Sequence, residues 1–375
     1  MPTRRHSLQT IPAELQLAIF EYLNAPQKAA LIESDIVSSD LLLRGCPIDE
    51  CDERDGMSML HAAARENYVK TTILLLLAGA ATSLPCRVKG DDGATPLILA
   101  SQYGNLEIIH LLMDHGASVT ECMSQGETCL HRACTFGESK VVEVLVDYGA
   151  DVNKKATLLG APLLVAAEKG HAEILRVLLA HGAKVNPMRA RYSGLAALHY
   201  AAQGGHVECV RLLLEAGAIA TYDPAPEEPG SFIHSPSLCR VAAGPHYRAA
   251  DDFLQLLWRR KHERLRFEWK EGQKEAYAEI LQLLIDAGGD VSETQTGYRA
   301  TPLHYAVVVG NSRAVKILLA EGTNVNARVE GQSALGLARL MGYEDIVEML
   351  SKAREARPDK LRKPPIGPKP RVQVP

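Results

Sequence analysis

Histidine and cysteine are the residues of this chain best suited to bind a metal or to act as bases and nucleophiles, and the sequence contains thirteen and eight of them. Four histidines stand at one recurring position, each directly after a leucine: His61, His131, His199 and His304. One imidazole in each distant copy does not supply the converging ligands that a metal site needs. The cysteines form no C-x-x-C pair, which argues against a structural zinc site. These patterns predict structural rather than chemical roles.

Other catalytic signatures point the same way. The sequence holds no glycine-rich phosphate loop, no G-x-S-x-G nucleophile elbow and no H-E-x-x-H zinc motif. We therefore predict no catalytic residue, no cofactor and no metal, and the chain is not expected to be an enzyme. The remaining enzyme alternative is a site hidden in the interruption described below, at residues 222–274.

The leucine that precedes each histidine belongs to an internal repeat. Its copies stand at Leu60, Leu97, Leu130, Leu163, Leu198, Leu303 and Leu335, at steps of 37, 33, 33, 35, 105 and 32 residues. A unit that recurs near every 33 residues predicts a solenoid, which grows by stacking and has no single core to outgrow. Function is then expected on a repeated surface and not in one cleft.

Each unit reads as two short helices joined by turns. A loop glycine precedes a Ser or Thr that is placed to cap the first helix, as Gly126 and Thr128 do. Small pairs such as Ala201-Ala202 keep that helix thin, so that neighbouring units stack closely. A second helix with apolar residues at helical spacing follows, and Gly-Ala ends it. The pattern predicts an all-α array.

The Thr-Pro-Leu-His-Tyr-Ala segment that begins at Thr301 resembles the signature of the ankyrin repeat family. This resemblance implies an all-α ankyrin repeat solenoid of helix-turn-helix-loop units over residues 27–352. We expect about nine repeats. The first, at residues 27–50, is degenerate, and the seventh is interrupted between Ala243 and Ala278. In this family the signature imidazole bridges backbone groups of adjacent loops.

The resemblance also implies the function and the surface that carries it. Ankyrin proteins usually bind a partner across the loop tips and the face of the first helices, so we expect a non-catalytic protein-interaction scaffold. The predicted partner-binding residues follow the small pair of each unit: Arg65, Glu66, Gln102, Tyr103, Thr135, Phe136, Glu168, Lys169, Gln203 and Val308. Tyr103 and Phe136 are either an aromatic anchor for the partner or are packed against their own neighbours.

Residues 1–26 depart from the repeat. Ile11–Leu23 resembles the first helix of an F-box, as in fungal proteins that combine an F-box with ankyrin repeats, and the match covers that helix alone. One alternative is therefore a substrate receptor of a ubiquitin ligase, whose adaptor would dock on residues 10–24 through Pro12, Leu15, Ile19 and Phe20. The other is a helix that only caps the end of the array.

The insertion at about 222–274 begins with a proline-rich loop, and its rear half predicts a long helix over 249–274. Arg259, Arg260 and Lys261 lie beside Trp258 there, and Trp269 follows further on. The insertion is either a protruding partner-binding element or an elongated repeat helix with solvated charges. Because the chain has no broader basic footprint, we expect no nucleic-acid binding.

The tail, residues 353–375, is rich in proline and basic residues and predicts disorder, with Pro365–Pro368 as a weak P-x-x-P motif. The whole chain is 46% apolar and 23% charged with a net charge of -4, which indicates an ordered protein without electrostatic drive toward membranes or nucleic acid. With no signal-like start and no long apolar run, we expect a monomer in the cytoplasm, with the nucleus as the other location.

Overall fold

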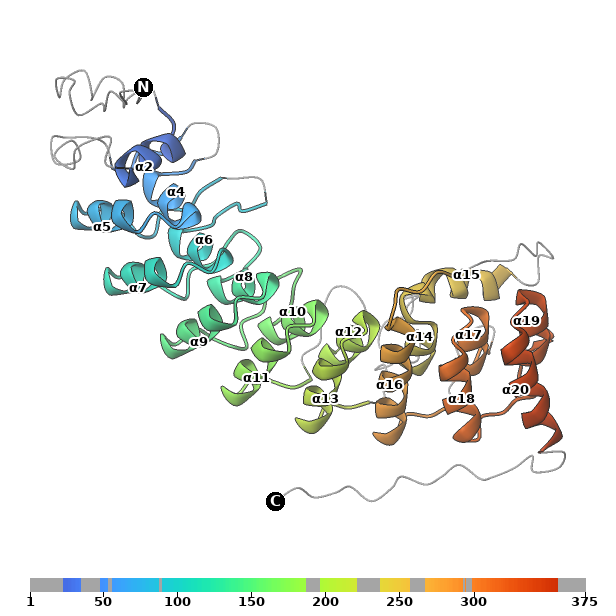
Figure 1. Cartoon of the computed structure of the whole chain (residues 1–375). Helices are drawn as coiled ribbons and strands as arrows, with labels where there is room; N and C mark the ends of the chain where they lie inside the picture. Colours follow the sequence, from blue (N-terminus) through green and yellow to red (C-terminus); the bar gives the residue numbers. More distant parts are fainter. Residues whose placement is uncertain are drawn as a thin grey trace, which may run out of the picture. The chain divides into compact units, whose positions relative to one another are not determined.

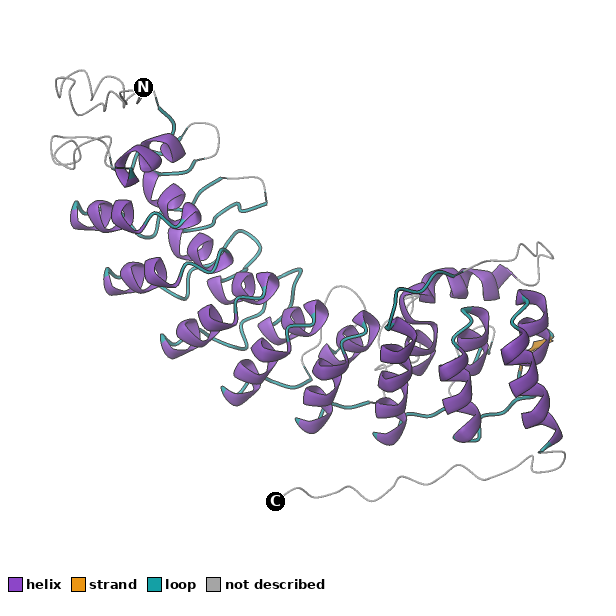
Figure 2. Cartoon of the chain, viewed as in Figure 1, coloured by secondary structure: helices purple, strands orange, loops and turns teal. Residues whose placement is uncertain are grey.

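The computed structural model describes residues 23–34, 48–52, 56–87, 90–186, 196–220, 237–256, 267–292, 294 and 299–356. The chain forms two compact units. The N-terminal unit is Met1–Ala166 with Glu173–Lys184, and the C-terminal unit is Ala167–Ala172 with Val185–Pro375. In the described residues both units are built almost entirely of short helices (Figures 1 and 2). The predicted all-α ankyrin solenoid is confirmed as the fold class.

The N-terminal unit stacks pairs of helices. Its helices are α2 (Ala25–Glu33), α4 (Met59–Glu66), α5 (Val69–Leu77), α6 (Pro96–Gln102), α7 (Leu106–Asp114), α8 (Cys129–Phe136) and α9 (Ser139–Asp147). The boundary between the units falls in the next pair, α10 (Pro162–Lys169) and α11 (Ala172–Ala180). The first helices α4, α6 and α8 lie in contact in sequence order, and α5 contacts α7. The signature leucines Leu60, Leu97 and Leu130 are fully buried in this stack.

The local sequence explains where each first helix begins and ends. Ser58 and Thr128 are extended N-cap residues, and each takes part in a capping box with the histidine three residues later. The turn into the second helix needs a left-handed residue, as at Gly170 with φ +80°. A Cβ at Gly170 would also meet the ring of His206 at 2.4 Å, so glycine permits the next repeat to approach.

The C-terminal unit continues the pattern. It holds α12 (Ala197–Gly204), α13 (Val207–Glu215), α14 (Ser237–Ala243), the 3-10 turn η2 (Gly244–His246), α15 (Tyr247–Leu256), α16 (Gln273–Asp286), α17 (Pro302–Val308), α18 (Ser312–Ala320), α19 (Ala334–Met341) and α20 (Glu344–Glu355). A hairpin of β1 (Arg328–Val329) and β2 (Gln332–Ser333) precedes α19, with Glu330 and Gly331 at positive φ in its turn. α20 continues to Glu355, past residue 353, where the tail was predicted to begin.

The interrupted repeat is α14 followed by α16. α14 contacts α12 before it and α17 after it, while α16 contacts α13 and α18, so both halves keep their places in the stack. η2 and α15 leave the stack between them, and α15 lies across α14 and α17 (Figure 1). The single helix expected over 249–274 is wrong: α15 ends at Leu256, and Phe267–Lys270 have no helical structure.

Two aromatic side chains fasten this interruption to the array. The Trp269 indole Nε1 donates a hydrogen bond of 2.9 Å to the Val309 carbonyl, and its ring packs edge-on against Tyr277. The Tyr277 hydroxyl donates a hydrogen bond of 2.7 Å to the Gln203 carbonyl at the end of α12. At the preceding junction His206 Nε2 lies 3.1 Å from the Glu168 carbonyl at the end of α10. Tyr277 therefore makes the corresponding contact from α16 to the end of α12.

We expect Tyr277→Phe to lower the free energy of unfolding by about 1–2 kcal/mol, because the Gln203 carbonyl loses its donor in a poorly solvated place. The same burial raises the pKa of Tyr277 to about 12. Urea denaturation at pH 7 measures the effect. Tyr103→Phe removes a hydroxyl from an exposed ring and serves as the control, with an expected change below about 0.5 kcal/mol. Equal losses in the two variants would contradict the assignment.

None of the helices in the described ranges has the length and apolar character that crossing a bilayer requires.

Candidate functional site

The signature histidines are parts of the frame. His131 Nδ1 accepts the backbone N–H of Thr128 at 3.2 Å, and its Nε2 lies 2.9 Å from the Gly160 carbonyl in the loop before α10. His304 makes the same pair of contacts with Thr301 N at 3.1 Å and the Ala327 carbonyl at 3.1 Å. Since a backbone N–H only donates, Nδ1 is the acceptor and Nε2 carries the proton. Each imidazole therefore joins its own helix cap to the next loop.

Burial fixes the protonation of these side chains. It lowers the pKa of His131, and it lowers the pKa of His304 to about 4. Both imidazoles are therefore neutral near pH 7, as their bridging hydrogen bonds require. A buried neutral base that is fully engaged with backbone groups has no access to a substrate proton.

Among the described residues, the buried cysteines of α8 are not suited to nucleophilic chemistry, and the acidic side chains form no metal cluster. Cys129 and Cys134 are buried in α8, and burial raises the pKa of Cys129 to about 12 and that of Cys134 further. Such thiols are the opposite of an activated nucleophile. Across the part of the chain that the structure describes, no three or more His, Cys, Asp or Glu side chains gather in a way that could hold a metal ion.

The predicted partner-binding residues of the N-terminal unit lie at the ends of the first helices. Tyr103 is 47% exposed after α6, and Phe136 is 48% exposed at the end of α8. They occupy equivalent positions, six residues after Leu97 and Leu130. α6 contacts α8, and a Cβ at Gly104 would meet the Glu138 carboxylate at 2.4 Å, so the two helix ends lie close together. The structure therefore brings the two aromatic rings onto one exposed face.

The neighbouring predicted residues differ in exposure. Arg65 and Glu66 lie at the end of α4, where the guanidinium Nε is 2.8 Å from the carboxylate, and Thr135 is half-buried. In the C-terminal unit Glu168 is half-buried, while Lys169 and Gln203 are exposed.

Two of the predicted contact residues are excluded by burial. Gln102 is buried at the end of α6, and Val308 is completely buried in α17. At both positions the array packs over a side chain that the helical pattern alone places on the outer surface. A partner that contacts the surface does not reach either side chain, so both are removed from the predicted surface.

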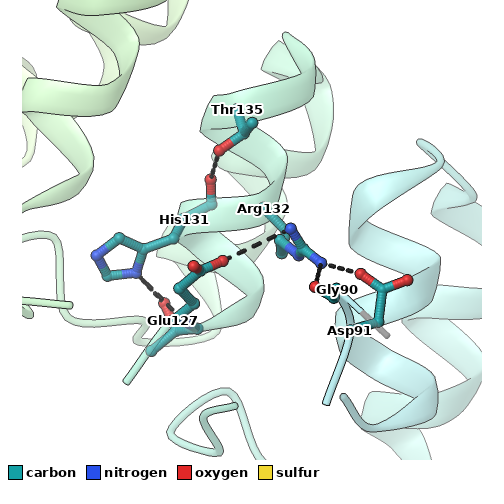
Figure 3. Close-up of polar contacts among 7 residues, drawn as sticks. Gly90, Asp91, Glu127, His131, Arg132 and Thr135 are labelled. Carbon is teal, nitrogen blue, oxygen red and sulfur yellow. Dashed lines mark hydrogen bonds and ion pairs between the residues drawn. The ribbon is translucent and has the colours of Figure 1, made fainter. Parts of the chain in front are cut away.

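Arg132 is a residue of the same face that the sequence pattern did not single out. Its guanidinium donates to the Gly90 carbonyl at 3.0 Å and to the Asp91 carboxylate, and it lies 3.6 Å from the Glu127 carboxylate (Figure 3). These groups come from two successive loop tips, so Arg132 fixes one loop against the next. The sequence could have indicated this role, because Arg132 is a charged residue at the position that Tyr200 and Tyr305 occupy in other units.

The comparison with protein families decides the assignment. The family model described as "Ankyrin repeats (3 copies)" matches residues 27–121, 60–156, 159–223 and 273–361, which together make up more than half of the chain. The chain is an ankyrin repeat protein. Ankyrin repeats are a non-catalytic interaction fold, which agrees with the structural roles of the histidines and buried thiols.

Several curated proteins are similar to this ankyrin repeat protein over part of its length. A putative ankyrin repeat-containing protein of Treponema pallidum (strain Nichols) is 37% identical over 84 residues, 22% of this chain and 27% of that protein. Potassium channel AKT3 of Oryza sativa subsp. japonica is 34% identical over 89 residues, 24% of this chain and 10% of the channel. Palmitoyltransferase ZDHHC17 of Homo sapiens is 34% identical over 87 residues, 22% of this chain and 14% of that enzyme. The chain thus spans 27% or less of these relatives.

The predicted adaptor-docking residues Pro12, Leu15, Ile19 and Phe20 lie outside the described residues. So do Trp258, the basic cluster from Arg259 onward, and the tail beyond residue 356. The F-box resemblance and the ubiquitin-ligase alternative stay predictions from the sequence.

Proposed function

We propose that this ankyrin repeat protein is a non-catalytic scaffold that binds a protein partner on the first-helix face and loop tips of its N-terminal unit. The pair of exposed rings, Tyr103 and Phe136, carries this proposal. Large aromatic side chains contribute binding energy out of proportion to their number, and equivalent positions on adjacent repeats present them together.

The loop tips beside these rings support the same surface. Arg132 ties Gly90 and Asp91 to Glu127 on its own loop, so these contacts join the two loops before a partner arrives. A surface that is already ordered loses less conformational entropy on binding. His61 and His131 add rigidity from inside, because the Nε2 of each one contacts a carbonyl of the loop that follows.

We expect Phe136→Ala to weaken the partner at least tenfold, which corresponds to about 1.4 kcal/mol, and to leave the thermal unfolding midpoint within about 2 °C of the wild type. The side chain is 48% exposed, so its removal opens no cavity of consequence. Quantitative affinity purification of the full chain measures the first effect, and differential scanning calorimetry measures the second.

Leu77→Ala is the matched control for Phe136→Ala. Leu77 is 73% exposed at the end of the second helix α5. The Leu77→Ala substitution therefore truncates an exposed apolar side chain outside the first-helix face. Proteins recovered with the wild type and with Leu77→Ala, but lost with Phe136→Ala, support the proposal. Equal recovery of the same proteins with all three chains would contradict the proposal. A large drop in the melting temperature of Phe136→Ala would show that Phe136 belongs to the core.

A further inference from the structure

We propose that the partner presents an amphipathic α-helix to Tyr103 and Phe136, with apolar side chains spaced i, i+3 and i+4. This inference rests on the proposed function and names the class of partner that the face accepts. It comes from the other unit of the same array, where one helix is already seated on a first-helix face.

That helix is α15. It contacts the first helices α14 and α17, and it lies on their side away from α16 and α18 (Figure 1). Its side chains Ala250, Phe253 and Leu254 are buried at spacings of three and four residues. This is the pattern by which an amphipathic helix binds a groove, with one apolar stripe inward. α15, which belongs to the insertion, therefore occupies the first-helix face of α14 and α17 as a bound helix would.

The end of α17, one of the helices that α15 crosses, is buried where the end of α8 stays open. Val308 and Val309 lie five and six residues after Leu303 and are both buried. Thr135 and Phe136 lie five and six residues after Leu130, where Thr135 is half-buried and Phe136 is 48% exposed. The frame is the same in both units, but among the described helices α15 crosses α14 and α17, and none crosses α6 and α8 (Figure 1). The equivalent face at α8, where the Phe136 ring is exposed, is thus open to a helix from another chain.

The spacing of the two rings fits this occupant. Packed helices lie about 8–10 Å apart, so equivalent side chains on α6 and α8 are separated by roughly that distance. A helix rises about 1.5 Å per residue, so residues seven apart stand about 10 Å from each other along one stripe. A helix laid across α6 and α8 would place two residues of its apolar stripe, seven positions and about two turns apart, over Tyr103 and over Phe136.

The test uses a fluorescent peptide with the sequence of residues 246–257, which contains Phe253 and Leu254. A matched peptide with both residues changed to serine is the control. Each peptide is titrated into the full-length wild type, the Tyr103→Ser/Phe136→Ser double variant, and Leu77→Ser as a control on the second-helix side. Anisotropy reports binding, and circular dichroism of the mixture reports helix formation.

We expect saturable binding of the first peptide to the wild type and to Leu77→Ser, with a gain in helicity. We expect at least tenfold weaker binding to the double variant, and none with the serine peptide. Binding that the double variant retains would place the peptide elsewhere, for example at the seat of α15, and would overturn the inference. Failure to saturate, or binding without a gain in helicity as for an extended segment, would also overturn it.

The two proposals fail separately. A partner that is lost from Phe136→Ala, together with a peptide that does not bind, leaves the scaffold function standing and removes the helical partner. A peptide that binds as a helix at the two rings, together with a partner unaffected by Phe136→Ala, supports the helix-binding face and removes the proposed partner surface.

Discussion

We expect His131→Ala to lower the free energy of unfolding by about 3 kcal/mol, a large share of the total for a protein of ordinary stability. The imidazole is completely buried and bridges two segments, with Nδ1 at the Thr128 cap and Nε2 at the Gly160 carbonyl. Alanine leaves the Thr128 N–H without its acceptor and removes one of the two donors to the Gly160 carbonyl, which keeps the Ala156 N–H. It also opens space in the core. Each unpaired buried group costs about 1–3 kcal/mol.

His115→Ala is the control for this experiment. His115 Nδ1 lies 2.8 Å from the Leu111 carbonyl, but the contact is exposed and water replaces it. We expect a change below about 0.5 kcal/mol. Urea denaturation of both variants, with the m-value compared, separates lost stability from a change in the transition itself. A His131→Ala loss no larger than that of His115→Ala would mean that the bridge does not hold the loops.

We expect the protein to lose stability as the pH falls from about 6.5 to about 4, with His304 contributing about 3 kcal/mol of that loss. Burial lowers the pKa of folded His304 to about 4, whereas its ordinary value is 6.5. Above pH 6.5 the imidazole is neutral in both states and has no effect. Below it the unfolded chain takes up the proton first, so unfolding is favoured until the folded side chain also titrates near pH 4.

Carboxylates also contribute to acid unfolding, so the effect is measured as a difference between chains. His304→Gln removes the titrating group, and its stability is compared with that of the wild type by urea denaturation at pH 7.5 and 4.5. The wild type should be the more stable at pH 7.5. We expect that advantage to shrink by about 2 kcal/mol at pH 4.5. An advantage that is the same at both pH values would contradict a neutral, buried His304.

The sequence predicted the fold through local signals that each repeat carries within itself. The cap at Thr128, the buried Leu130 and the bridging His131 are encoded within four residues, and the family match confirms the repeat that they belong to. Because the same signals recur in several units, each unit supports the assignment of the others. The interruption after Ala243 followed from the same spacing, since no signature leucine appears between Leu198 and Leu303.

The surface was harder to predict because it depends on neighbours that no single repeat specifies. The helical pattern gave Val309 and Phe136 the same position, yet Val309 is buried and Phe136 is exposed. Gln102 is also buried, although the same pattern places it on the surface. Arg132 was missed because its partners Gly90 and Asp91 belong to the preceding loop. Trp269 belonged to the insertion for which a protruding partner-binding element was one alternative, but its hydrogen bond to the Val309 carbonyl fastens it to the array.

The repeat that is divided between α14 and α16 shows how an array of this kind can accommodate an insertion. α14 is held sideways by α12 and α17, and α16 is held by α13 and α18. Lateral packing, and not the peptide link between the two helices, therefore keeps this repeat in register with its neighbours. A segment inserted at that turn lengthens the polypeptide without shifting the phase of the stack. A turn between the two helices of a repeat is therefore a position where a solenoid can accept additional elements while the stacking of its repeats stays unchanged.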